Sequence, residues 1–158
     1  KFYDEYSIMQ LTRFTDYGLR SLMYLEVRPD ELSSVKEISD HYGISRNHLV
    51  KVVHRLSQLG YIETSKGKGG GIRIASGTKD LRLGDLVKQL EPNMFMVECF
   101  DAATNTCRIT GSCQLKHYLF DAAKAFTDSL NQYTLADTVK NKKSLFTPDA
   151  KLEKRIQK

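Results

Sequence analysis

The sequence predicts a mainly α-helical protein with a small β-wing: a winged helix-turn-helix module followed by a long amphipathic helix. Three observations predict this fold class. Two short helical patterns flank a glycine-containing turn, a glycine-rich hairpin pattern follows them, and a longer helical stripe of apolar residues lies nearer the carboxyl end. A length of 158 residues is close to that of one ordinary domain, which excludes a large multidomain enzyme.

The first three helices are predicted from spacing and capping residues. Residues 12–27 mix apolar and charged positions at helical spacing. In the second helix Ser34 and Glu37 form a capping-box pair, and Gly43 is typical of the left-handed residue that ends a helix. Ser45 is the expected N-cap of the third helix. The buried stripe expected on the third helix consists of Leu49, Val52, Val53, Leu56 and Leu59, ahead of Gly60.

The remaining elements follow from glycine content and apolar periodicity. Short strand patterns at 61–62 and 72–75 flank the glycines of 67–71, which predicts a hairpin wing. Residues 81–90 form a further helix, whereas 99–113 lack apolar periodicity and are expected to be a loop. From Gln114 an apolar stripe continues for about five turns, longer than a lone surface helix needs, which predicts a dimerisation helix. The residues expected at the dimer contact are Leu115, Leu119, Ala122, Phe126, Leu130 and Tyr133.

This pattern divides the chain into four segments. We interpret residues 1–8, ahead of Met9, as a tag or upstream extension, and 9–80 as the winged helix-turn-helix domain. Residues 81–140 are assigned to the cysteine loop and dimerisation helices, including a short helix near 135–140, and 141–158 to a disordered basic tail. No apolar run long enough for a membrane span and no secretory signal pattern is present, so a cytoplasmic protein is expected.

Positive charge is concentrated in one part of the chain. Residues 45–79 contain seven Lys and Arg residues and a single acid, Glu63, and therefore carry a net charge of +6. Because the whole chain carries +5, everything outside this segment sums to −1. A basic segment that coincides with a helix-turn-helix pattern is typical of a surface that binds double-stranded DNA.

Within this segment, different residues suit different DNA contacts. The first residues of a recognition helix meet base edges in the major groove, and Arg46 and Asn47 can bind guanine and adenine with two hydrogen bonds each. Lys51, one turn later, is better placed for phosphates, as are the lysines of the wing. The predicted DNA-binding residues are Ser45, Arg46, Asn47, His48, Lys51, Arg55, Lys66, Lys68, Gly70 and Arg73.

All three cysteines, Cys99, Cys107 and Cys113, fall within fifteen residues. Their odd number argues against a disulfide framework, and their loose spacing differs from the close pairs of a zinc site. A polynuclear iron-sulfur cluster spans ligands farther apart, and thiolates are its usual ligands. We therefore expect a cluster here, with reactive thiols, a disulfide switch or inert buried cysteines as alternatives. Three thiolates leave one iron in need of an oxygen donor, an external thiol or His117.

Several stretches resemble a known family. MQLTRFTDYGLRSLMYL, GISRNHLVKVVHRLSQLGYIETSKGKGGGIRI, LRLGDLVKQLEP and the cysteine trio, in one collinear order over about residues 9–140, closely resemble the NsrR family of nitric-oxide-sensing repressors, related to the iron-sulfur regulator IscR. The resemblance implies a homodimer that represses promoters of nitric-oxide detoxification genes and releases operator DNA when nitric oxide reacts with its cluster. It also implies that Asp16, in the F-T-D-Y motif, reaches the cluster from the partner subunit as the fourth ligand.

The resemblance leaves a set of alternatives. Relatives similar to IscR carry a histidine three residues after the last cysteine, where this chain has Lys116, which favours the nitric-oxide branch over an iron-sulfur status regulator. A 4Fe-4S cluster is favoured over 2Fe-2S because one carboxylate per subunit suits a single unique iron. A cluster-free thiol-redox regulator is a further alternative. An enzyme or electron carrier is disfavoured, because no nucleophile–base pair, cofactor-binding strand–helix unit or carboxylate dyad is present.

Overall fold

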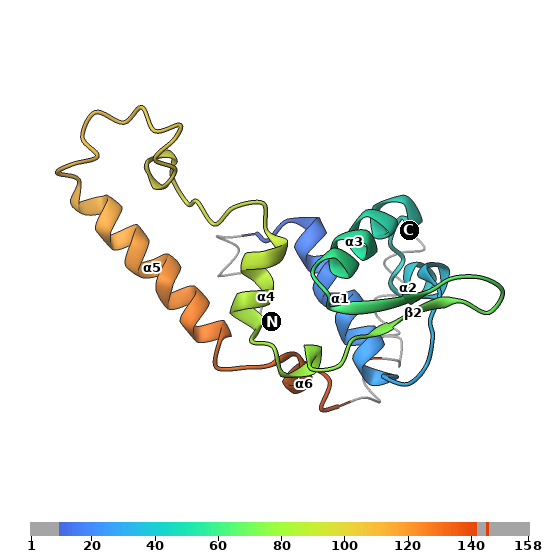
Figure 1. Ribbon diagram of the computed structural model, residues 1–158. Helices are drawn as coiled ribbons and strands as arrows, with labels where there is room; N and C mark the ends of the chain where they lie inside the picture. Colours follow the sequence, from blue (N-terminus) through green and yellow to red (C-terminus); the bar gives the residue numbers. More distant parts are fainter. Residues whose placement is uncertain (1–9, 142–144, 146–158) are drawn as a thin grey trace, which may run out of the picture.

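A computed structural model describes residues 10–141 and residue 145. In this part of the chain three helices come first, a two-stranded hairpin follows, and three further helices come after it (Figure 1). Two short 3-10 turns precede the fourth and the fifth helix. The elements are α1 (Arg13–Val27), α2 (Val35–Tyr42), α3 (Arg46–Gln58), β1 (Ile62–Ser65), β2 (Gly71–Ile74), η1 (Thr78–Asp80), α4 (Leu83–Leu90), η2 (Glu98–Phe100), α5 (Gln114–Leu130) and α6 (Leu135–Thr138). The predicted fold class is confirmed.

The start of α1 is held from two directions. Its N-cap Thr12 accepts a hydrogen bond from the Thr15 backbone N–H through its side chain. The Thr12 backbone N–H donates to Glu91 Oε1 at 2.7 Å, across 79 positions of sequence. Glu91 directly follows α4, so a hydrogen bond joins the beginning of the first helix to the segment that leads into the cysteines.

The helix-turn-helix is built as the sequence predicts. Ser34 and Glu37 form the capping box of α2, and the hydrogen bonds from the Ser34 backbone and side chain lower the pKa of Glu37. Gly43 ends α2 in the left-handed region at φ 63°, which a residue with a Cβ adopts only at a cost. The turn then leads directly into α3, whose buried positions Leu49, Val52, Val53 and Leu56 match the predicted stripe, while Leu59 is half-buried.

The wing is an antiparallel hairpin. Its register pairs Ile62 with Ile74 and Ser65 with Gly71. The Ile72 backbone also exchanges hydrogen bonds with Ser33, at 2.8 and 2.9 Å, so the loop before α2 lies along the open edge of β2. These bonds fix the base of the wing against the helix-turn-helix, while the loop between the strands extends away from the body (Figure 1).

One hydrophobic core joins the early and the late helices. Leu22 and Leu25 of α1 and Leu56 of α3 are fully buried in it. Leu86 of α4 and Leu135, at the start of α6, belong to the same core. The core therefore contains residues from both sides of position 80, and the functional division at that point stays a prediction.

The long helix α5 is attached mainly at its carboxyl end. Figure 1 shows it standing beside α4, with the cysteine loop connecting the two helices at the far end. At the attached end the Asn131 side chain accepts from the Asp85 backbone N–H at 3.1 Å and donates to the Asp85 carboxylate at 3.2 Å. Among the described residues, no helix has the length and apolar content needed to cross a membrane.

The contact between α4 and α5 depends on Gly84. A Cβ added there would lie 2.5 Å from Asn131 Oδ1 and 2.6 Å from the Thr127 carbonyl oxygen. Gly84→Ala is therefore expected to lower the free energy of unfolding by about 1–3 kcal/mol, because the two helices must move apart. Urea denaturation measures this difference. Gly111→Ala, at a glycine with nothing within 4 Å of the added Cβ, is the control, and equal stability of the two variants would contradict this contact.

Two predicted segments lie outside the described residues. The extension at 1–8 falls entirely in the part of the chain that is not described, as does the tail beyond residue 141, apart from residue 145. Both interpretations stay predictions.

Candidate nucleic-acid interface and cysteine loop

The recognition helix presents a polar face at its first turn. Arg46, Asn47 and His48 are all exposed, as are Lys51 and Arg55 farther along α3. Because the apolar stripe of α3 faces the core, this polar side is the one available to a groove of DNA.

Two members of the predicted set have contacts that the sequence does not reveal. Ser45 occupies the N-cap position of α3, but its side chain makes no cap hydrogen bond. Its hydroxyl can therefore donate a hydrogen bond to a group outside the protein, such as a DNA phosphate. The Arg55 guanidinium lies 3.4 Å from the Gln89 carbonyl oxygen at the end of α4. Arg55 thus connects α3 to α4 as well as adding charge.

The wing tip combines exposed lysines with glycines that its shape requires. Lys66 and Lys68 are exposed on the loop between β1 and β2. Gly67 and Gly69 have φ of 96° and 81°, and a Cβ on Gly70 would collide with the Ser65 carbonyl oxygen. The role of Gly70 in the structure is therefore to permit the tight turn that carries the lysines.

Arg73 differs from the two wing lysines. Its guanidinium forms an ion pair with Glu63 on the opposite strand at 2.7 Å, and both side chains are about half exposed. An exposed pair of this kind is weak, so DNA phosphate can compete for the guanidinium. In the free chain, however, the unpaired charge of the wing comes from Lys66 and Lys68.

Two substitutions should separate sequence reading from phosphate binding. Asn47→Ala is expected to reduce discrimination among operator variants, because a two-bond contact to a base contributes about 1–3 kcal/mol of specificity. Lys68→Ala should weaken every duplex alike and flatten the salt dependence by about one unit. Fluorescence anisotropy on operator and random duplexes measures both effects. Equal losses on the two duplexes for Asn47→Ala would remove Asn47 from base reading.

The cysteines lie in one internally hydrogen-bonded loop. Cys99 is in η2, Cys107 directly precedes the turn at 108–110, and Cys113 is the N-cap of α5. Asn105 accepts from the Cys107 backbone N–H at 3.0 Å, and the Thr110 hydroxyl donates to the Cys107 carbonyl oxygen at 2.8 Å. All three thiols are free and half-buried. The loop thus has a folded middle around Cys107, with one cysteine at each end.

The single chain does not assemble a complete ligand set. Within residues 10–141 and 145, no three His, Cys, Asp or Glu side chains are gathered as metal ligands would be. Asp16 lies on α1, and its carboxylate accepts a hydrogen bond from Arg20 at 2.8 Å. Its side chain is 41% exposed, so it is accessible to another subunit. Within one chain, therefore, Asp16 is not gathered with two or more of the cysteines as a ligand set requires.

The stripe on α5 is divided into two parts. Near the cysteine loop Leu115 is 61% exposed, and beyond the helix Tyr133 is 53% exposed. Leu119 is half-buried and Ala122 exposed. The sequence places all six positions at a dimer contact, and in the single chain three of them, Leu115, Ala122 and Tyr133, are exposed.

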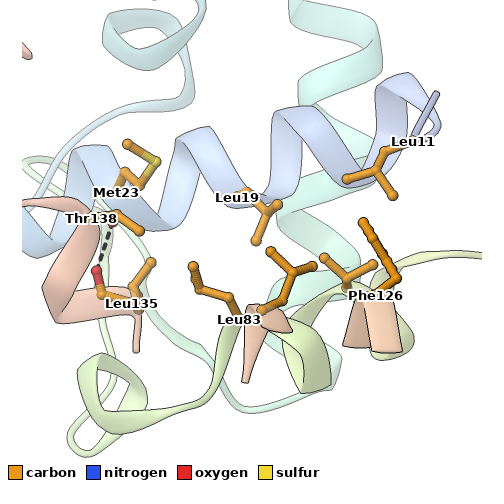
Figure 2. A pocket seen from close by; sticks show the side chains of 9 residues that line it. Leu11, Leu19, Met23, Leu83, Phe126, Leu135 and Thr138 are labelled. Carbon is orange, nitrogen blue, oxygen red and sulfur yellow. Dashed lines mark hydrogen bonds between the residues drawn. The ribbon is translucent and has the colours of Figure 1, made fainter. Parts of the chain in front are cut away.

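The other part of the stripe opens onto an apolar hollow. Phe126 and Leu130 are half-buried and line a cavity of about 320 Å³ between α1, α4, α5 and α6. Figure 2 shows Phe126 near Leu11 at one end of the hollow, with Leu19 of α1 and Leu83 of α4 nearer its middle. These two residues therefore contact their own chain as well as facing outward, and their role in dimerisation stays a prediction.

A family model matches residues 11–141 of the chain. It describes Rrf2, an iron-dependent transcriptional regulator. The HTH-type transcriptional regulator NsrR of Bacillus subtilis is 49% identical over 138 residues, which cover 87% of this chain and 94% of the relative. The NsrR of Shouchella clausii is 50% identical, with 87% and 93% covered.

Solved structures share the fold at low sequence identity. CymR of Bacillus subtilis, described as a global cysteine regulator, superimposes with a TM-score of 0.66 at 21% identity, covering 83% of this chain and 96% of CymR. IscR of T. potens gives a TM-score of 0.67 at 18% identity, covering 92% and 96%. At these identities the likeness shows the arrangement of helices and wing, and no more.

Proposed function

The chain belongs to the Rrf2 family of DNA-binding transcriptional regulators, and we propose that it is a homodimeric repressor that senses nitric oxide through an iron-sulfur cluster. Its targets are operators of nitric-oxide detoxification genes, so it acts in the cytoplasm. The observation that carries the proposal is that one chain joins an exposed recognition helix to a loop of three free thiols. Two relatives named NsrR, each about half identical in sequence to this chain, support the same assignment.

DNA binding rests on α3 and the wing. Arg46 and Asn47 read base edges, His48 lies beside them, and Lys66 and Lys68 hold phosphates next to the same groove. A dimer presents two such modules, so the operator consists of two half-sites related by the symmetry of the protein. Their spacing is set by the dimer contact along α5.

The cysteine loop suits a cluster in its donor chemistry. Cys99, Cys107 and Cys113 are free thiols in one loop, and thiolates are the ligands that iron-sulfur clusters take. Asp16 of the partner subunit would supply the fourth ligand, because its carboxylate is accessible on the surface of α1. Its hydrogen bond to Arg20 must then be exchanged or shared. When bound, the cluster, 4Fe-4S in preference to 2Fe-2S, supplies iron that reacts with nitric oxide.

The chain itself contains a path from the loop to the DNA-binding surface. The segment that begins at Glu91 leads to Cys99, and Glu91 holds the Thr12 backbone at the start of α1. Helix α1 packs against α3. A change in the position of the cysteine loop can therefore shift α1, and with it the recognition helix, out of the spacing that two half-sites require.

Metal content is the first test of this proposal. Protein purified without oxygen should be brown. It should contain iron and sulfide in equal amounts that correspond to about one cluster per chain. A colourless protein whose DNA affinity follows oxidation of its thiols would instead support the cluster-free redox regulator. A coloured protein whose affinity is insensitive to nitric oxide, but changes on cluster loading, would support an iron-sulfur status regulator.

A further inference from the structure

A hollow lies where the start of α1 meets the recognition helix. It has a volume of about 220 Å³ and is lined by Arg13, Phe14, Tyr17, His48, Lys51 and Val52. The aromatic rings are half-buried and Val52 is buried, whereas the three basic side chains are exposed. In Figure 1 the start of α1 lies on one side of α3, and the wing loop extends on the other. The hollow thus lies next to the polar face of α3, away from the wing.

The basic residues of the hollow hold no carboxylate. Among the ion pairs of the described residues, none involves Arg13 or Lys51. The acid in the same turn as Arg13, Asp16, is already paired with Arg20. Two full positive charges therefore face outward beside an aromatic surface.

We propose that this hollow holds a phosphodiester of the DNA backbone, next to the groove that α3 enters. The Arg13 guanidinium and the Lys51 ammonium bind phosphate oxygens, and the rings of Phe14 and Tyr17 pack against the adjoining deoxyribose. This inference rests on the proposed DNA-binding function and adds α1 to the DNA-contacting elements.

The chemistry of each group fits this occupant. A guanidinium binds phosphate with two parallel hydrogen bonds, and an ammonium acts as a point charge beside it. Lys51 lies one turn after Asn47 on α3, so a base contact by Asn47 brings the flanking backbone toward Lys51. Contacts to phosphate and sugar fix the orientation of a recognition helix in its groove. The contact in the hollow would therefore set the angle at which α3 enters the groove of the DNA.

The first experiment measures salt dependence. Anisotropy titrations of cluster-loaded protein with a fluorescein-labelled random-sequence duplex compare the wild type, Arg13→Gln and Arg82→Gln. Arg13→Gln is expected to bind about fivefold more weakly and to lower the slope of log affinity against log salt by about one. Arg82→Gln is the matched control, because Arg82 is exposed before α4, outside the hollow, with its guanidinium 3.5 Å from the Gln132 carbonyl oxygen. It should behave as the wild type.

The second experiment locates the phosphate. On a duplex selected from a random pool by the wild-type protein, a neutral methylphosphonate at the contacted position should weaken the wild type but not weaken Arg13→Gln further. Wild-type affinity and slope in Arg13→Gln, or equal effects of every methylphosphonate on both proteins, would overturn this inference alone. Absence of salt-dependent binding by the wild type itself would overturn the proposed function with it.

Discussion

Phe126→Asp is expected to convert the proposed dimer into monomers. Phe126 lies on the half-buried part of the α5 stripe, where it faces the hollow between α1 and α5. Burial of such a side chain against a partner contributes about 1.5–3 kcal/mol to the free energy of association. In a two-fold symmetric dimer the same contact occurs twice. A charge in its place would also remain without a counter-ion. Sedimentation velocity at micromolar concentration measures the result.

A second variant separates dissociation from misfolding. Phe126 also contacts its own chain, whereas Leu115 is 61% exposed, so Leu115→Asp should leave the fold intact and still weaken the dimer. Val50→Asp is the control, because Val50 is an exposed apolar residue of α3, away from α5. If the two α5 variants retain the circular dichroism and the dimeric sedimentation of the wild type, α5 has been wrongly assigned.

Cys107→Ala is expected to abolish both the cluster and tight operator binding. Cys107 lies in the middle of the loop, where Asn105 and Thr110 hold its backbone, and the other two thiols of the loop are themselves proposed ligands. Anaerobic iron and sulfide analysis, followed by gel-shift titration, measures both losses. Thr106→Ala, at an exposed neighbour in the same loop, controls for disturbance of the loop. Tight operator binding by metal-free Cys107→Ala would contradict a role for the cluster.

Asp16→Ala should give a different result from Cys107→Ala. The three cysteines of this variant can still hold iron, but the proposed link between the loop of one subunit and α1 of the other is removed. Operator binding should therefore weaken or respond abnormally to nitric oxide. Asp40→Ala is the matched control, because Asp40 is also an exposed helix carboxylate paired with a basic residue four positions away. If Asp16→Ala keeps the wild-type operator affinity and response to nitric oxide, Asp16 is not the fourth ligand of the cluster. His117 or an external ligand would then take that position.

Local elements of this fold could be predicted, because short sequence motifs determine them. The capping box at Ser34 and Glu37 and the left-handed Gly43 involve residues within one or two turns of each other. The wing follows equally from alternating residues around glycines that permit a tight turn. Spacing alone was sufficient for these features.

Contacts between distant segments could not be predicted from spacing. The hydrogen bond from Thr12 to Glu91 joins positions 79 apart, and neither residue carries a pattern that points to the other. The same holds for the hollow beside Arg13, because Arg13 is an ordinary helix residue until α1 packs against α3. The ion pair of Arg73 with Glu63 depends on the register of the hairpin, which changes the role expected for Arg73.

The cysteine site illustrates a different limit. The sequence predicts its ligands by type and by resemblance, whereas the described residues of the single chain do not gather Asp16 and the cysteines into one ligand set. A ligand set shared between subunits is completed only by the partner and the bound group. Neither the spacing nor the fold of one chain contains that information.

The central claim is that nitric oxide controls operator affinity through the cysteine loop. Anaerobic anisotropy titration of the cluster-loaded wild type with its selected operator duplex, before and after a stoichiometric nitric-oxide donor, tests it directly. We predict a rise in Kd of about a hundredfold, which corresponds to a coupling free energy of about 3 kcal/mol. An unchanged Kd, with the donor shown to have consumed the cluster, would contradict the claim.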